Sequence, residues 1–234
     1  MKRTHVTTFY SYKGGVGRTT ALLNAAFALS RAGKSVFIME LDLEAPSLMA
    51  LPLFAETRAK VKGGVVDILA TPQYQDLQKQ LTALVVDHHD ETLAAPIRIL
   101  AAGLPGPEYA TSFGKADFAK LFATSEGADL FELLRREIES TYSPDFLLID
   151  SRTGLTDVGA VAVFQLADTV VLVTTLSEQS LAGSQMAQLQ IFEAAETRRA
   201  DLKVLRIASH VPADQPDLVK TALATAEKFG AGFG

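Results

Sequence analysis

The sequence contains no cysteine, no long apolar run and no excess of basic residues. Without cysteine, a disulfide framework, a thiolate metal site and a thiol nucleophile are all excluded. No apolar stretch reaches the roughly 18 residues of a membrane-spanning helix, and no apolar leader follows Met1, so we expect a cytoplasmic protein that is neither exported nor membrane-bound. The net charge of −5 argues against a globally basic nucleic-acid binder.

Short apolar runs of strand length alternate with longer helical patterns along the 234 residues. Continuously apolar strands such as the one from Phe146 to Ile149 are typical of a sheet that is covered on both faces. We therefore predict an α/β, doubly wound fold with a mostly parallel sheet and helices on both faces. The predicted strands are 6–12, 35–42, 97–103, 145–150, 169–175 and 203–209, and the main helices are 19–33 and 180–200.

We expect residues 1–234 to form a single domain, because 48% of them are hydrophobic and can bury one substantial core. Residues 52–64 and 103–116 are rich in glycine and proline and are predicted to be loops. The helical pattern at the end of the chain runs into glycine where such a fold would add another strand. This pattern indicates a chain that is truncated at its C-terminus.

A glycine loop, SYKGGVGRTT at residues 11–20, stands between the first predicted strand and a helix that begins near Thr19. In such a layout backbone N–H groups wrap a phosphate and the helix N-terminus adds a favourable dipole. The strict phosphate-loop pattern fails twice, at Tyr12 and at Arg18, where glycine and lysine are expected. The segment instead resembles the deviant Walker A motif, KGGxGK followed by two hydroxyl residues, of the ParA/MinD family of P-loop ATPases. Arg18 is the one departure from that motif.

Two acidic strand ends support the resemblance. The phrase FIMELDLEAPSL ends the second predicted strand, and its Asp42 matches the catalytic aspartate of the family's switch I. The phrase DFLLIDSRTG places Asp150 at the Walker B position, followed by a loop with Gly154 that resembles switch II. The three motifs occur in family order, each at the carboxyl end of a strand, where doubly wound sheets bind their ligands.

The resemblance implies a P-loop NTPase of SIMIBI type with ATP and Mg²⁺ as cofactors. Asp42 would orient the attacking water, and Lys13 would reach the phosphates of a partner subunit. Mg²⁺ would be held by Thr19 and Asp150, since this cation prefers oxygen ligands. The nucleotide-binding residues implied by the motif are Gly14, Gly15, Val16, Gly17, Arg18, Thr19 and Thr20.

The implied function is a slowly hydrolysing ATPase that acts as a nucleotide-controlled dimerisation switch, with ATP and ADP forms that differ in their protein partner. One alternative is a low-turnover nucleotide-binding interaction module of a larger signalling or defence protein. Another, less favoured, is an ATP-dependent amidoligase-like enzyme. We expect weak or no DNA binding and interpret the basic cluster as the solvated end of a helix: Arg198, Arg199, Lys203 and Arg206.

Other polar residues near these motifs have structural interpretations. Glu40 and Glu44 are read as structural or solvated acids beside Asp42. Arg152 follows Asp150 and could approach a terminal phosphate, but a surface ion pair is favoured.

Three polar residues outside the motifs complete the candidates. His88, in the HHDE segment, is interpreted as part of a solvated helix end and not as a metal ligand, because no other ligand has suitable spacing. Ser209 and His210 end the last predicted strand, where relatives recognise the base. They are candidates for adenine contacts, although neither has the amide side chain that many relatives use.

Overall fold

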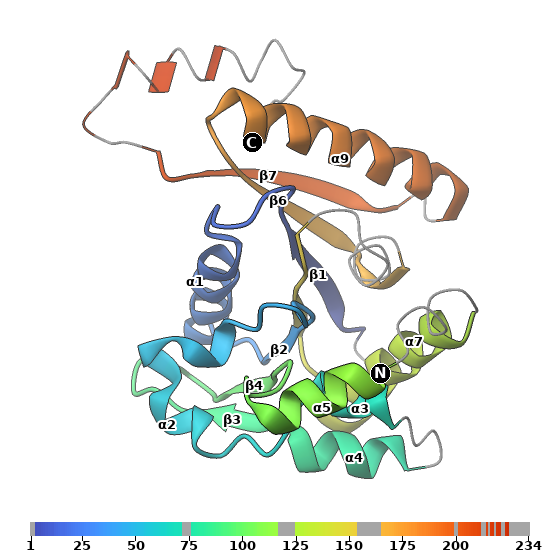
Figure 1. The fold of residues 1–234 in the computed structure, drawn as a ribbon. Coiled ribbons are helices and arrows are strands. Elements are labelled where there is room, and N and C mark those ends of the chain that lie inside the picture. Colours follow the sequence, from blue (N-terminus) through green and yellow to red (C-terminus); the bar gives the residue numbers. More distant parts are fainter. Residues whose placement is uncertain are drawn as a thin grey trace.

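The computed structural model describes residues 3–71, 76–116, 125–153, 165–198 and 201–211, together with residues 214, 216–217, 219–220 and 223–224. Figure 1 shows these parts of the chain as a twisted sheet between helices. The predictions for Gly154, for Arg199 and for the glycine-ending segment 225–234 lie outside the described residues.

The sheet has seven strands in the order β3-β4-β2-β5-β1-β6-β7. Only β3 runs antiparallel to its neighbour among the described strands, so the sheet is mostly parallel, as predicted. All six predicted strands are present, and β3 is an addition that the sequence did not indicate. Their bounds are β1 His5–Tyr10, β2 Val36–Glu40, β3 Val86–His88, β4 Ile97–Leu100, β5 Phe146–Asp150, β6 Thr169–Thr175 and β7 Lys203–Ser209.

Helices cover both faces of this sheet (Figure 1), which confirms the doubly wound architecture. The face with α1 also carries two short 3-10 helices and α2: α1 Arg18–Arg31, η1 Leu48–Ala50, η2 Pro52–Phe54 and α2 Ala55–Arg58. The opposite face carries α3 Val65–Ala70, α4 Leu77–Leu84, α7 Ser125–Tyr142 and α9 Glu178–Arg198, and α5 Pro107–Lys115 packs against α3.

Alternation along the central strand β5 divides the core into two layers. Leu147 and Ile149 pack with α3, α4 and α7, whereas Leu148 points to the layer beneath α1. Because β5 is buried on both sides, its polar end is the exception that needs an explanation. Asp150 is that end, and it is completely buried.

Three local predictions are wrong. Residues 103–116 are not a loop throughout, because Pro107 occupies the first turn of α5, where its fixed φ favours a helix. The predicted loop 52–64 likewise contains η2 and α2. His88 is neither solvated nor in a helix: it ends β3, is buried and accepts or donates a hydrogen bond with Thr57 at 2.9 Å.

The carboxyl ends of β1, β2 and β5 meet at one edge of the sheet. The backbone N–H of Leu41 donates a hydrogen bond to the backbone carbonyl of Asp150, and the N–H of Ser151 donates one to the carbonyl of Phe9. The loops that leave these strands are therefore held together. The glycine loop, the segment with Asp42 and the segment with Asp150 therefore lie side by side.

Candidate functional site

The glycine loop joins β1 to α1 through two residues in the left-handed region. Gly15 has a φ of 73° and Gly17 a φ of 79°, conformations that strain any residue with a Cβ. A Cβ added at Gly14 would meet no protein atom within 4 Å, so this part of the loop faces open space. The loop thus presents backbone, without side chains, to whatever enters the space.

The first turn of α1 has no side-chain cap at Gly17 and no acidic residue. The N–H groups at a helix start have no partner within the helix, and the helix dipole makes this end electropositive. A helix start of this kind, preceded by glycines, is a ready anion site.

Arg18 is 7% exposed and bridges two of the acidic strand ends. Its Nε donates to Asp150 at 2.6 Å and its Nη2 donates to Asp42 at 2.7 Å. Burial lowers the pKa of Arg18, but Asp150 and Asp42 outweigh that effect and raise it. In the described part of the chain its third nitrogen, Nη1, is buried without a hydrogen-bond partner.

Asp150 accepts hydrogen bonds from two residues in the first turn of α1, Arg18 and Thr19. Its second oxygen accepts a hydrogen bond of 2.7 Å from the hydroxyl of Thr19. Burial raises the pKa of this carboxyl, while Arg18 and Thr19 oppose the rise because both stabilise the ionised form. A carboxylate beside a hydroxyl supplies the oxygen ligands that Mg²⁺ prefers.

Glu40 is a buried structural acid, as the sequence suggested. One of its oxygens accepts hydrogen bonds from the N–H groups of Ser47 and Leu48, and the other accepts one from Ala102. Burial raises its pKa to about 7, and these N–H donors limit the rise. Glu40 thereby fixes the start and the end of the loop that carries Asp42.

A cavity of about 410 Å³ opens at this edge of the sheet. Arg152 and Glu44 form an ion pair across it, so the predicted surface ion pair of Arg152 is confirmed. The cavity is lined by Ser11, Gly14, Gly15, Val16, Gly17, Arg18, Thr19, Thr20, Asp42, Glu44, Ala45, Ser47, Arg152 and Thr153.

Lys13 points toward α9 in this structure, where its ammonium group donates a hydrogen bond to Gln179. Ser209, at the end of β7, donates to the carbonyl oxygens of Val16 and Thr174. Its hydroxyl therefore supports the glycine loop. The sequence did not indicate Gln179 or this role of Ser209, because no motif links residues so far apart in the chain.

His210 lies beside the glycine loop, since its Nε2 would be 3.6 Å from a Cβ built on Gly17. The basic cluster is not a helix end throughout. Lys203 and Arg206 belong to β7, and Arg206 donates a hydrogen bond to Gln188 of α9.

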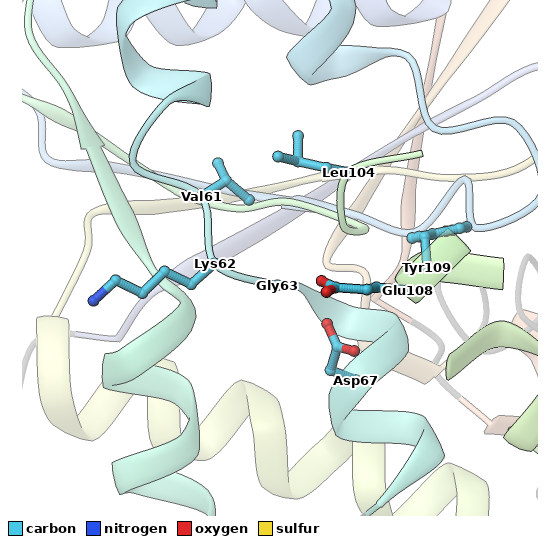
Figure 2. Close-up of a pocket in the computed structure, with 7 residues that line it drawn as sticks. All are labelled: Val61, Lys62, Gly63, Asp67, Leu104, Glu108 and Tyr109. Atoms are coloured by element: carbon cyan, nitrogen blue, oxygen red, sulfur yellow. The ribbon is translucent and has the colours of Figure 1, made fainter. Parts of the chain in front are cut away.

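A smaller pocket of about 110 Å³ lies between the start of α3 and α5. Figure 2 shows Asp67 and Glu108 beside Gly63, with Lys62 pointing away from them. Two carboxylates without an inward cation disfavour an anionic ligand. The cavity at the glycine loop is therefore the better candidate for phosphate.

Within the described residues no group of three or more histidine, aspartate or glutamate side chains is placed to hold a metal by itself. A Mg²⁺ ion at Thr19 and Asp150 would need further oxygen ligands, as this ion usually takes from substrate phosphates and water. None of the described helices is both long enough and apolar enough to cross a membrane.

A strand that leads through a glycine loop into the first helix of a doubly wound parallel sheet is typical of P-loop NTPases and of dinucleotide-binding Rossmann folds. The AAA_31 family model, described as an AAA domain, matches residues 4–204. The chain therefore belongs to this family of ParA/MinD-type P-loop ATPases.

Known proteins with similar sequence or structure agree with this assignment. A curated relative is the cytosolic Fe-S cluster assembly factor nubp2 of Danio rerio, 33% identical over 90 residues, which are 38% of this chain and 34% of nubp2. The match thus spans about a third of that protein's length.

Two solved structures share the fold. The cell-division ATPase MinD of Pyrococcus furiosus superposes with a TM-score of 0.64 at 19% identity, covering 99% of this chain and 81% of MinD. Cobyrinic acid a,c-diamide synthase of Mycobacterium smegmatis, solved with ADP and magnesium, gives a TM-score of 0.70 at 16% identity, with coverages of 97% and 82%.

Proposed function

We propose that this chain binds ATP with Mg²⁺ at the glycine loop and hydrolyses it slowly. The observation that carries the proposal is the buried Nη1 of Arg18, which has no hydrogen-bond partner among the described residues. It lies at an uncapped helix start, beside a glycine loop with open space before it. A buried donor without a partner is costly, and a phosphate oxygen would satisfy it.

The nucleotide contacts are assigned to backbone and hydroxyl groups of residues 14–20. Thr20 would bind a phosphate oxygen, while Thr19 and Asp150 would hold Mg²⁺, since the hydroxyl of Thr19 lies 2.7 Å from the carboxylate of Asp150 and both offer oxygen ligands. Bound Mg²⁺ would neutralise charge on the phosphates. Asp42, which accepts a hydrogen bond from a different nitrogen of Arg18 than Asp150 does, would orient the attacking water.

The chain would act as a nucleotide-controlled switch that forms a homodimer with ATP. Lys13 is the residue proposed to reach the partner's phosphates, and its hydrogen bond to Gln179 lies at the protein surface, where it can be exchanged at low cost. A further protein partner would distinguish the ATP and ADP forms. DNA binding would be weak or absent, because Arg206 is engaged with α9.

One contact favours the low-turnover alternative, in which the chain is a nucleotide-binding interaction module. Asp42 accepts a hydrogen bond from Arg18, and a carboxylate held in this way is less able to accept a proton from water. Hydrolysis then requires that Arg18 move away from Asp42.

Isothermal titration calorimetry with ATP and ADP, with and without Mg²⁺, tests the proposal. We expect binding of both nucleotides, strengthened by Mg²⁺. Asp42→Asn should retain binding and lose turnover, whereas Asp87→Asn, on the distant strand β3, should change neither. Absence of heat with both nucleotides would overturn the proposal, and equal loss of binding and turnover in Asp42→Asn would give Asp42 a structural role.

A further inference from the structure

The cavity at the glycine loop has little positive charge left for a nucleotide. Arg18 lies between Asp42 and Asp150, so its single positive charge is outnumbered by two negative ones. Two of its three nitrogens are also occupied. Lys13 is hydrogen-bonded to Gln179 and does not line the described cavity. A triphosphate bound there with Mg²⁺ would gain from a further cationic side chain of the protein.

Arg152 is the cation in a position to supply that charge. It lines the same cavity as Gly14–Thr20 and follows Asp150 by two residues, at the end of β5. A guanidinium carries its charge at every physiological pH and presents a planar set of donors that fits phosphate oxygens.

The present partner of Arg152 can be replaced easily. Its side chain is 29% exposed and that of Glu44 is 50% exposed. Exposed ion pairs contribute little to stability, whereas a terminal phosphate offers more charge and several acceptor oxygens. Glu44 also lines the cavity, so its carboxylate would repel an incoming phosphate while it remained in place.

We propose that Arg152 leaves Glu44 and binds the terminal phosphate of ATP, which makes it the residue by which the site distinguishes ATP from ADP. This inference rests on the proposed nucleotide binding. The exchange also links two loops, because Glu44 lies two residues after Asp42 and Arg152 lies two residues after Asp150. Release of Glu44 frees the loop that carries Asp42 only when a terminal phosphate is present, so the two nucleotide states differ in structure at this edge.

The test compares ATP and ADP affinities of the full chain by calorimetry in the presence of Mg²⁺. Arg152→Ala should weaken ATP binding about 10- to 100-fold, the loss expected for a charged hydrogen bond, and change ADP binding less than about 2-fold. Glu44→Gln should strengthen ATP binding a few-fold, because it removes the competing partner. Arg136→Ala removes an exposed, ion-paired arginine of α7 and should change neither affinity.

The ADP affinity of each variant also reports whether the loop is correctly folded. Equal weakening of ATP and ADP binding in Arg152→Ala would overturn the inference, since it would place Arg152 on a phosphate common to both or in loop folding. An unchanged ATP affinity would overturn it as well. If the unmodified protein binds neither ATP nor ADP, the proposed function itself is wrong. If the unmodified protein binds both and Arg152→Ala binds ATP equally well, only the inference about Arg152 is wrong.

Discussion

Replacing Arg18 by alanine tests the most deeply buried ionic contact of the site. The guanidinium is 7% exposed, and its partners Asp150 and Asp42 are 0% and 13% exposed. When one partner of a buried pair is removed, the remaining carboxylate stays out of water without its counter-ion. We expect Arg18→Ala to lower the free energy of unfolding of the nucleotide-free protein by about 3 to 5 kcal/mol at neutral pH.

Urea unfolding with linear extrapolation measures this loss. Arg136→Ala is the matched control, because it also removes an arginine that forms an ion pair. Its partner is Glu132 of the same helix, and the Arg136 side chain is 66% exposed. Its loss should be about 0 to 1 kcal/mol. The large difference between the two variants is the expected result.

The loss in Arg18→Ala should depend on pH in a defined direction. Without the guanidinium, burial raises the pKa of Asp150 further above its ordinary value of 3.8. A carboxyl with a raised pKa in the folded state destabilises that state at high pH and ceases to do so once it is protonated. The difference in unfolding free energy between Arg18→Ala and wild type should therefore narrow as the pH falls toward that ordinary value of 3.8. Two results would refute the reasoning. One is a urea midpoint of Arg18→Ala equal to that of Arg136→Ala, and the other is a difference in unfolding free energy from wild type that does not narrow at low pH.

Three further changes have separate expected outcomes. Lys13→Ala should leave nucleotide binding by the monomer nearly intact and abolish ATP-dependent dimerisation, measured by light scattering; loss of monomer binding would contradict the cross-subunit role. Glu40→Gln should cost about 1 to 3 kcal/mol in urea unfolding, because its amide group must face at least one backbone N–H. Burial lowers the pKa of His88 below 6.5, so the melting temperature should fall as the pH drops through that value. His88→Leu should reduce this dependence of the melting temperature on pH, and an unchanged dependence would exclude His88 as its cause.

The parts of the fold that follow from local chemistry were predictable. Continuous apolar runs marked the buried parallel strands, and the polar residues that end them marked the edge where the site lies. The helical pattern of residues 19–33 predicted α1, which ends at Arg31 and is followed by Gly33 at a φ of 77°. Positive φ at this position is the physical reason for the glycine.

Other elements lacked a local signal. Strand β3 has three residues, too few for a period to be visible. Its His88 is buried against Phe54 and Phe27, with ring centroids 4.7 Å and 5.8 Å apart. Helix α5 was hidden by the glycines and prolines before it, although Pro107 favours a helix start. These outcomes depend on neighbours distant in sequence.

The partners of Arg18 also could not be read from the sequence, since Asp42 and Asp150 are 24 and 132 residues away. The motif suggested only that this position faces phosphate. What decides its partners is the sheet register, which pairs Glu40 with Asp150 and brings the acidic ends of β2 and β5 together.

That register explains why an arginine suits this position in the nucleotide-free protein. Glu40 accepts hydrogen bonds from three backbone N–H groups, whereas Asp42 and Asp150 accept hydrogen bonds from side chains at the start of α1. Arg18 reaches both because Nε and Nη2 are separate donors of one planar group, so in the described part of the chain one side chain satisfies two carboxylates and keeps Nη1 for a third acceptor. A lysine ammonium is a single compact charge and cannot span the two in this way. Arg18→Lys should therefore release Asp42. If the contact between Arg18 and Asp42 restrains hydrolysis, this variant should keep its ATP affinity and hydrolyse ATP faster. Unchanged turnover would show that the contact does not restrain hydrolysis.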